Sequence, residues 1–157
     1  MQHANNTRSL TPHWLVCAAM LTLLTTYNLF CHLWAVDMRL HLDEAQRVVF
    51  RTAFYVLAII IFPFTNLMRH ILLRLNQTMP GEKSASQRYL LTIIITQSMI
   101  EVVSLFGPVM YLLGDDFNTL YIFSVLGLVG IALHRPKQDD YQAIARALTV
   151  KPDSANL

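Results

Sequence analysis

The fold class follows from residues 89–113, YLLTIIITQSMIEVVSLFGPVMYLL. These 25 consecutive residues contain one charged side chain, Glu101, and they do not alternate between polar and apolar positions. A helix needs about 20 mainly apolar residues to cross the hydrocarbon core of a bilayer. A continuous apolar run favours such a helix over a membrane strand, which would alternate. The segment is therefore predicted to be a transmembrane helix.

Three further apolar runs accompany this segment, at residues 14–36, 48–73 and 117–133. Each is long enough for a span, for which the usual range is about 17 to 25 residues. Together the four runs predict an all-α integral membrane protein, with four transmembrane helices in an up-and-down bundle. We expect a single membrane domain over residues 1–157, of which 134–157 form a tail.

Two polar segments next to these runs have weaker helical patterns. Residues 37–47 carry spaced apolar side chains and are expected to form a short helix along the membrane surface. Residues 139–150 place Tyr141, Ile144 and Leu148 on one side, which predicts an amphipathic helix with Asp139 as its N-cap.

The composition agrees with a membrane location. The chain is 54% hydrophobic and 14% charged, whereas a soluble domain carries about 25% charged residues. This excludes a soluble globular enzyme, a disordered chain and a nucleic-acid-binding module. The net charge of +2 is too small to indicate a polyanionic partner. The expected partners are the lipid bilayer, and other membrane subunits or further copies of the chain.

Lysine and arginine residues are distributed unevenly between the two sides of such a bundle. The N-terminus, the second loop and the tail share one side and hold nine of the twelve basic residues. The first loop region holds the other three, which are Arg39, Arg47 and Arg51. Because basic residues accumulate on the cytoplasmic side, both termini are predicted to be cytoplasmic and the acidic turn 114–116 to face outward. Short loops and this bias are typical of a bacterial inner membrane.

Glu101 lies in the middle of its run, near the expected bilayer midplane. A charged carboxylate at the centre of a transmembrane helix costs about 2.5–3.5 kcal/mol on insertion scales. A carboxyl group that gains and loses a proton at this depth suits a proton- or cation-coupled device. Gln97 and Ser98 lie within one turn, and Ser124 is expected at a similar depth, so these residues are the candidate ion- or proton-carrying set. The structural alternative is a protonated Glu101 that donates a hydrogen bond to a neighbouring helix.

Several small or helix-perturbing residues predict close helix packing. Gly127 and Gly130 would allow another backbone to approach the last run. Gly107 and Pro108 thin the third run and free a backbone carbonyl, and Pro63 does the same in the second run.

Histidines raise a third hypothesis, a haem held by His70 together with His13 or His134 near the cytoplasmic face. The favoured interpretation is that these are interfacial histidines at helix ends, beside basic residues. The sequence has no metal-ligand spacing, phosphate loop, dinucleotide fingerprint or nucleophile constellation. Cys17 and Cys31 lie 14 residues apart in one run, which is too far for a disulfide within a straight helix. We therefore expect no cofactor, no metal and no enzymatic activity.

Part of the chain resembles a known membrane family. The relevant residues are a polar loop with Arg74 and Pro80-Gly81-Glu82, and a helix with Met99-Ile100-Glu101-Val102-Val103 and Phe106-Gly107-Pro108-Val109. Over residues 74–113 this resembles the proteolipid c subunit of rotary ATP synthases, and the resemblance implies that Glu101 is the ion-carrying carboxylate. Two features depart from that family: residues 52–73 contain no glycine, and the chain has four runs rather than two.

The complete layout resembles a second group, small uncharacterised four-helix bacterial inner-membrane proteins. The shared features are a glutamate in the third helix and a basic-proline end to the fourth, here Arg135-Pro136. This resemblance implies a fold and no activity.

Two function hypotheses follow. The first is a non-enzymatic multi-pass membrane protein that serves as a small accessory or assembly subunit of a membrane complex, as the short loops and the missing catalytic set indicate. The second is a component of a proton- or cation-coupled channel or transporter that uses Glu101.

Overall fold

The computed structural model describes the backbone of residues 2–79 and 83–150, and the side chains of residues 10–79 and 83–149. Within these ranges all regular secondary structure is helical, with no strand, which confirms the all-α prediction. The elements in order are α1 (Gln2–Leu33), the 3-10 helix η1 (Ala35–Met38), α2 (Glu44–Thr78), α3 (Ala85–Leu112), α4 (Phe117–Leu133) and α5 (Gln138–Val150).

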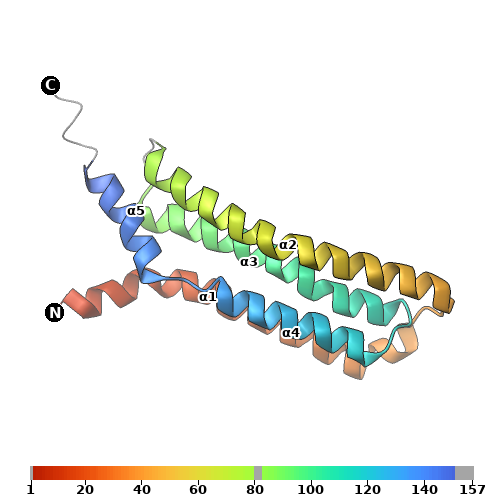
Figure 1. Ribbon diagram of the computed structural model, residues 1–157. Coiled ribbons are helices and arrows are strands. Elements are labelled where there is room, and N and C mark those ends of the chain that lie inside the picture. Colours follow the sequence, from red (N-terminus) through yellow and green to blue (C-terminus); the bar gives the residue numbers. More distant parts are fainter. Residues whose placement is uncertain (1, 80–82, 151–157) are drawn as a thin grey trace.

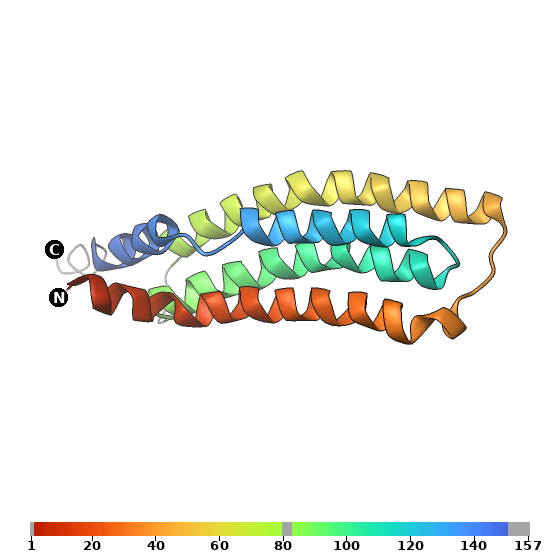
Figure 2. The same ribbon diagram turned by 90° about the horizontal axis from the view of Figure 1, so that it is seen from below.

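The four long helices α1 to α4 lie side by side, and α3 and α4 lie between α1 and α2 (Figure 2). The start of α1 and the helix α5 lie at the same end of the molecule (Figure 1). Helix α3 packs against α1, α2 and α4 and contains the largest set of buried residues. It is therefore the central helix, and most of its polar side chains are buried against other helices.

Three helices are long and apolar enough to cross a membrane: residues Leu10–Leu33 of α1, together with α2 and α3. Helix α4 has 17 residues and meets the same test only when it is joined to α5 across a bend of 43°. The described residues thus contain three candidate spans, or four if that bent pair forms one span.

Side-chain caps set the starts of α2, α3 and α4. Asp43 accepts a hydrogen bond from the Gln46 backbone N–H at 3.0 Å, so α2 begins at Glu44, before the start predicted at residue 48. Ser84 forms a capping box with Gln87 at the start of α3. These caps satisfy backbone N–H groups that have no partner within the helix.

The predicted short helix over residues 37–47 is wrong. The 3-10 turn Ala35–Met38 covers only its start, the backbone at Arg39 is extended, and residues 44–47 already belong to α2. The Leu40 N–H donates to the Leu112 carbonyl at 2.7 Å. This bond ties the segment to the end of α3, and the Asp43 cap then starts α2, so no separate surface helix forms.

The C-terminal helix is present, but its start differs from the prediction. Asp139 lies in the first turn of α5 rather than at its N-cap. Ile144 is fully buried, and Tyr141 and Leu148 pack against the same apolar cluster. Because this cluster also contains Cys17 and other residues of α1 and α3, α5 closes the end of the helix packing with its apolar side.

Glycines allow α3 and α4 to approach each other closely. A Cβ atom on Gly127 would lie 1.8 Å from Ser104 Oγ, and one on Gly130 would lie 2.5 Å from Ile100 Cγ2. Gly107 also lies close to α4, where a Cβ atom would be 3.0 Å from the Leu120 backbone oxygen. The small residues identified in the sequence are thus used between helices of the same chain.

Candidate functional site

Glu101 is buried in the central helix and is 5% exposed. Neither of its carboxyl oxygens has a hydrogen-bond partner among the described residues. Buried polar groups in proteins nearly always find such a partner, because the free energy lost on leaving water is otherwise not recovered. An unpartnered carboxyl group in the middle of an apolar helix therefore requires an explanation.

Glu101 belongs to a stripe of buried polar side chains along α3. The stripe comprises Thr92, Thr96, Gln97, Glu101 and Ser104. Most of its members are satisfied locally: Thr96 donates to the Thr92 carbonyl at 2.9 Å, and Ser104 donates to the Ile100 carbonyl at 3.3 Å. The hydroxyl groups on this face of α3 therefore donate to backbone carbonyls of their own helix, whereas the Glu101 carboxyl group forms no such hydrogen bond.

Tyr27 of α1 faces Glu101 across the helix interface. Its hydroxyl interacts electrostatically with Glu101 and with Ser104. No hydrogen bond of normal geometry joins these groups, and the Tyr27 hydroxyl also has no such partner among the residues described. A phenol and a carboxyl group, both unpartnered, therefore lie close together between α1 and α3.

Gln97 lies one turn before Glu101 and links three helices. Its amide Nε2 contacts Cys17 Sγ at 3.3 Å in α1, and donates to the Ile131 and His134 carbonyls at 3.3 and 3.2 Å at the end of α4. Its Oε1 has no hydrogen-bond partner within the described part of the chain. The amide nitrogen of Gln97 thus joins α3 to α1 and α4, whereas its amide oxygen remains without a donor among the described residues.

The structure does not bring Ser98 or Ser124 to Glu101. Ser98 is exposed and shares the outward face of α3 with Val102 and Leu105. Ser124 donates to Asn28 Oδ1 of α1 at 2.9 Å and to a carbonyl of its own helix at 2.8 Å. The expected contact between Ser124 and Glu101 is therefore replaced by a contact with α1, and the polar residue that faces the carboxyl group from another helix is Tyr27.

The acidic turn between α3 and α4 is surrounded by arginines from the first loop and α2. Arg51 binds the Asp115 carboxylate with two hydrogen bonds, of 2.8 Å from Nε and 2.5 Å from its terminal nitrogen. Arg39 and Arg47 donate to the Gly114 carbonyl at 3.0 and 3.1 Å. The three basic residues on this side are thus used to hold the turn, which has a positive φ of 97° at Gly114.

This environment keeps Asp115 ionised. Burial alone would raise the pKa of the Asp115 carboxyl group, but hydrogen bonds from Arg51, Thr119 and the Asp116 backbone hold the pKa below its ordinary value. Asp115 is 1% exposed, so its charge is compensated by specific donors rather than by water.

A second polar cluster closes the opposite end of the helices, where α5 lies. Arg69 of α2 donates to the His134 carbonyl at 2.8 Å and pairs with Asp140 of α5 at 2.8 Å. The Tyr89 hydroxyl contacts the backbone N–H and carbonyl of Lys137, at 2.7 and 3.1 Å. These contacts fix the linker between α4 and α5.

The histidines considered for haem lie in separate packing environments. His13 is fully buried and contacts the Ser86 carbonyl at 3.2 Å and the Tyr89 ring at 4.9 Å between centroids. His134 contacts the Gly130 carbonyl of its own helix at 3.0 Å, and His70 is exposed. The described residues contain no group of three or more His, Cys, Asp or Glu side chains that could hold a metal ion.

Two parts of this arrangement were missed by sequence reasoning. Tyr27 was not singled out, although it lies in the first run among the threonines and Asn28. The capture of Asp115 by Arg51 could have been anticipated, because the three arginines and the acidic turn were assigned to the same side. The helix partner of Glu101, in contrast, depends on how the helices rotate against each other, and no local signal in the sequence gives that.

No family model, no curated protein and no solved structure matches this chain.

Proposed function

We propose that this chain is an integral membrane protein in which Glu101 takes up and releases a proton, as a component of a proton- or cation-coupled channel or transporter. The observation that carries this proposal is the burial of a carboxyl group, 5% exposed, whose two oxygens have no hydrogen-bond partner among the described residues. Ionisable residues inside transmembrane segments are rare and commonly mark ion or proton pathways.

The proposal includes a membrane layout. Four spans, α1 to α4, run up and down in a bundle, and both termini lie in the cytoplasm of a bacterial cell. The layout is supported by the side-by-side packing of these helices (Figure 1), by the apolar character of α1, α2 and α3, and by the nine-to-three distribution of basic residues. In this layout Glu101 lies near the bilayer midplane.

The contacts of Glu101 favour a proton site over a purely structural role. A glutamate that only joined helices would donate its proton to a neighbouring acceptor, and its bond would be complete within the chain. Here the polar group that faces the carboxyl group from another helix is the Tyr27 hydroxyl, which has no hydrogen bond of normal geometry to a described residue. The carboxyl group and this phenol thus lie together between α1 and α3, and the carboxyl group retains the capacity to bind or release a proton.

The substitution Glu101→Gln tests the role, because glutamine keeps the shape and hydrogen-bonding capacity but does not titrate. The protein is reconstituted into liposomes, and proton flux is followed with a pH-sensitive dye under an imposed gradient. We expect Glu101→Gln to abolish the flux. Glu44→Gln is the matched control: it makes the same chemical change at an exposed carboxylate whose side chain is 70% exposed, and flux should persist. Unchanged flux in a correctly inserted Glu101→Gln protein would contradict the proposal.

A second function is favoured by the exposed face of α2. This helix has the smallest buried share among the three candidate spans, and Ile59 is 71% and Ile60 56% exposed. We propose as the alternative a non-enzymatic accessory or assembly subunit, in which α2 contacts other membrane subunits or further copies of the chain. Light scattering after extraction in mild detergent tests it. A stable complex larger than the single chain would support the assembly role, and a lone monomer would count against it.

A further inference from the structure

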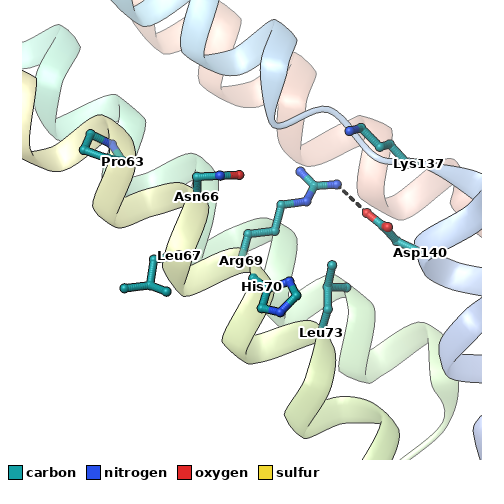
Figure 3. A pocket seen from close by; sticks show the side chains of 8 residues that line it. All are labelled: Pro63, Asn66, Leu67, Arg69, His70, Leu73, Lys137 and Asp140. Atoms are coloured by element: carbon teal, nitrogen blue, oxygen red, sulfur yellow. Dashed lines mark hydrogen bonds and ion pairs between the residues drawn. The ribbon is translucent and has the colours of Figure 1, made fainter.

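A pocket of about 430 Å³ lies between α2 and the linker that leads into α5. Figure 3 shows its lining residues: Arg69 extends from α2 toward Asp140, and Lys137 lies beside them on the linker. The complete lining is Pro63, Asn66, Leu67, Arg69, His70, Leu73, Lys137 and Asp140. The pocket thus joins one side of α2 to the polar cluster that closes this end of the molecule.

The charged side chains of this pocket differ in whether they already have a partner. Arg69 is occupied by the carbonyls of His134 and Arg135 and by the carboxylate of Asp140. The carboxylate of Asp140 is in turn neutralised by Arg69. The Lys137 ammonium group has no hydrogen-bond or ion-pair partner among the described side chains. One cation is therefore available to a ligand, in a pocket whose only acidic residue is already paired.

The pocket is also amphipathic. Leu67 and Leu73 line it along α2, and Leu67 is 53% exposed. In the proposed layout this end of α2 lies at the cytoplasmic boundary of the bilayer, where acyl chains meet headgroups. A ligand there meets apolar side chains on the membrane side and Lys137 on the cytoplasmic side.

We infer that this pocket binds the phosphate of an anionic phospholipid headgroup, with Lys137 as the principal contact and the acyl chains along Leu67 and Leu73. Basic pockets between transmembrane helices on the cytoplasmic side suit such headgroups. A zwitterionic headgroup fits less well, because its own positively charged group would be repelled by the basic side chains of the pocket. The inference rests on the proposed membrane placement and is independent of the role of Glu101.

Native mass spectrometry of the detergent-solubilised protein, titrated with phosphatidylglycerol or phosphatidylcholine, tests the inference. We expect phosphatidylglycerol to bind more tightly than phosphatidylcholine. The substitution Lys137→Gln should weaken the binding of phosphatidylglycerol about fivefold, which corresponds to about 1 kcal/mol per basic residue. The variant should fold, because the contacts of residue 137 with Tyr89 use its backbone.

Arg146→Gln is the matched control, since it removes one positive charge from α5 outside the pocket. Its affinity for phosphatidylglycerol should stay within twofold of the unchanged protein. Equal weakening by both substitutions would overturn the inference in favour of general surface attraction. Displacement of the lipid by inorganic phosphate at similar affinity would overturn the lipid assignment, because the ligand would then be the free anion. Unchanged binding in Lys137→Gln would also overturn it, and His70→Gln serves as a second variant if Lys137→Gln does not fold.

Discussion

Asp115 and Glu101 are both buried carboxyl groups, but their surroundings are opposite. Asp115, in the turn between α3 and α4, receives two hydrogen bonds from Arg51 and one from the Asp116 backbone. Glu101, in the middle of α3, receives none from the described residues. The difference separates two environments of the same chemical group. One is a carboxylate held by several donors in a turn, and the other is a carboxyl group that only the Tyr27 hydroxyl faces, for which we propose proton exchange.

Charged and polar contacts hold both ends of the molecule. At the turn, Arg39, Arg47 and Arg51 come from one segment and meet the backbone and side chains of another. At the other end, Arg69 and Tyr89 fix the linker before α5. Between these clusters the helices are joined by apolar contacts, by close glycine packing and by the hydrogen bonds of Gln97 and Ser124, and Glu101 forms no ion pair with a described residue.

The largest effect on stability is expected from Gly114→Ala. A Cβ atom at this position would lie 2.4 Å from the Leu40 carbonyl oxygen, and the residue has a positive φ of 97°. Backbone strain and the clash together should lower the free energy of unfolding by about 3 kcal/mol. Unfolding in mixed micelles with increasing denaturing detergent measures this. A change below about 1 kcal/mol would show that the turn is not rigidly held.

Asp115→Asn should lower the free energy of unfolding by about 2 kcal/mol, because it leaves the Arg51 guanidinium without its carboxylate. The figure is below that of a fully buried pair, since the Arg51 side chain is 32% exposed to solvent. The same unfolding assay measures this loss. Asp116→Asn is not a suitable control, because Asp116 caps the start of α4. Glu44→Gln, at an exposed position, is the better reference and should change little.

The stabilisation by Asp115 should depend on pH. Its folded-state pKa is lower than that of the unfolded chain, so the stabilisation is fully present above the unfolded pKa of about 4. It is lost as the pH falls through the lower folded pKa. The difference in melting temperature between the unchanged protein and Asp115→Asn should therefore shrink below about pH 4. A difference in melting temperature that stays unchanged well below about pH 4 would contradict the ion-pair explanation.

Gly130→Ala should have a moderate effect of about 1 kcal/mol. Its Cβ atom would meet the Ile100 side chain at 2.5 Å, but that side chain can change its rotamer. The expected result is a small loss of stability with unchanged helix content by circular dichroism. Ala132 on the same helix is exposed, so Ala132→Gly offers a comparison without contact at the α3–α4 interface.

The smallest effect on stability is expected from Glu101→Gln, below about 0.5 kcal/mol. No ion pair or hydrogen bond within the described chain is lost by this change. The contrast with Asp115→Asn is the essential result. If Glu101→Gln lowered the free energy of unfolding as much as Asp115→Asn does, the Glu101 carboxyl group would be structural.

Much of the fold could be predicted from residue order alone. The continuous apolar runs indicated the helices, the glycines at 127 and 130 indicated close packing, and the spacing of Tyr141, Ile144 and Leu148 indicated a helical tail. Residues 37–47 were misassigned because the Leu40–Leu112 backbone bond joins segments far apart in the chain. Local apolar spacing contains no information about such a bond.

The candidate site could be predicted only in part. Glu101 is conspicuous as the lone charge in an apolar run, and Gln97 follows from helical spacing. Whether Ser124 or Tyr27 faces the carboxyl group depends on the rotation of α1 and α4, and Ser124 turns toward Asn28 instead. Which residues surround a buried group is therefore decided by helix packing, after the helices themselves are fixed.

The most direct test of the central claim is infrared difference spectroscopy on the protein in liposomes, recorded as the pH is changed. A carboxyl group that exchanges a proton inside the membrane gives a carbonyl stretching band of the protonated acid that changes with pH. The account predicts such a band in the unchanged protein, its presence in Glu44→Gln and its absence in Glu101→Gln. A spectrum in which Glu101→Gln removes no pH-dependent carbonyl band would contradict the claim that Glu101 takes up and releases a proton.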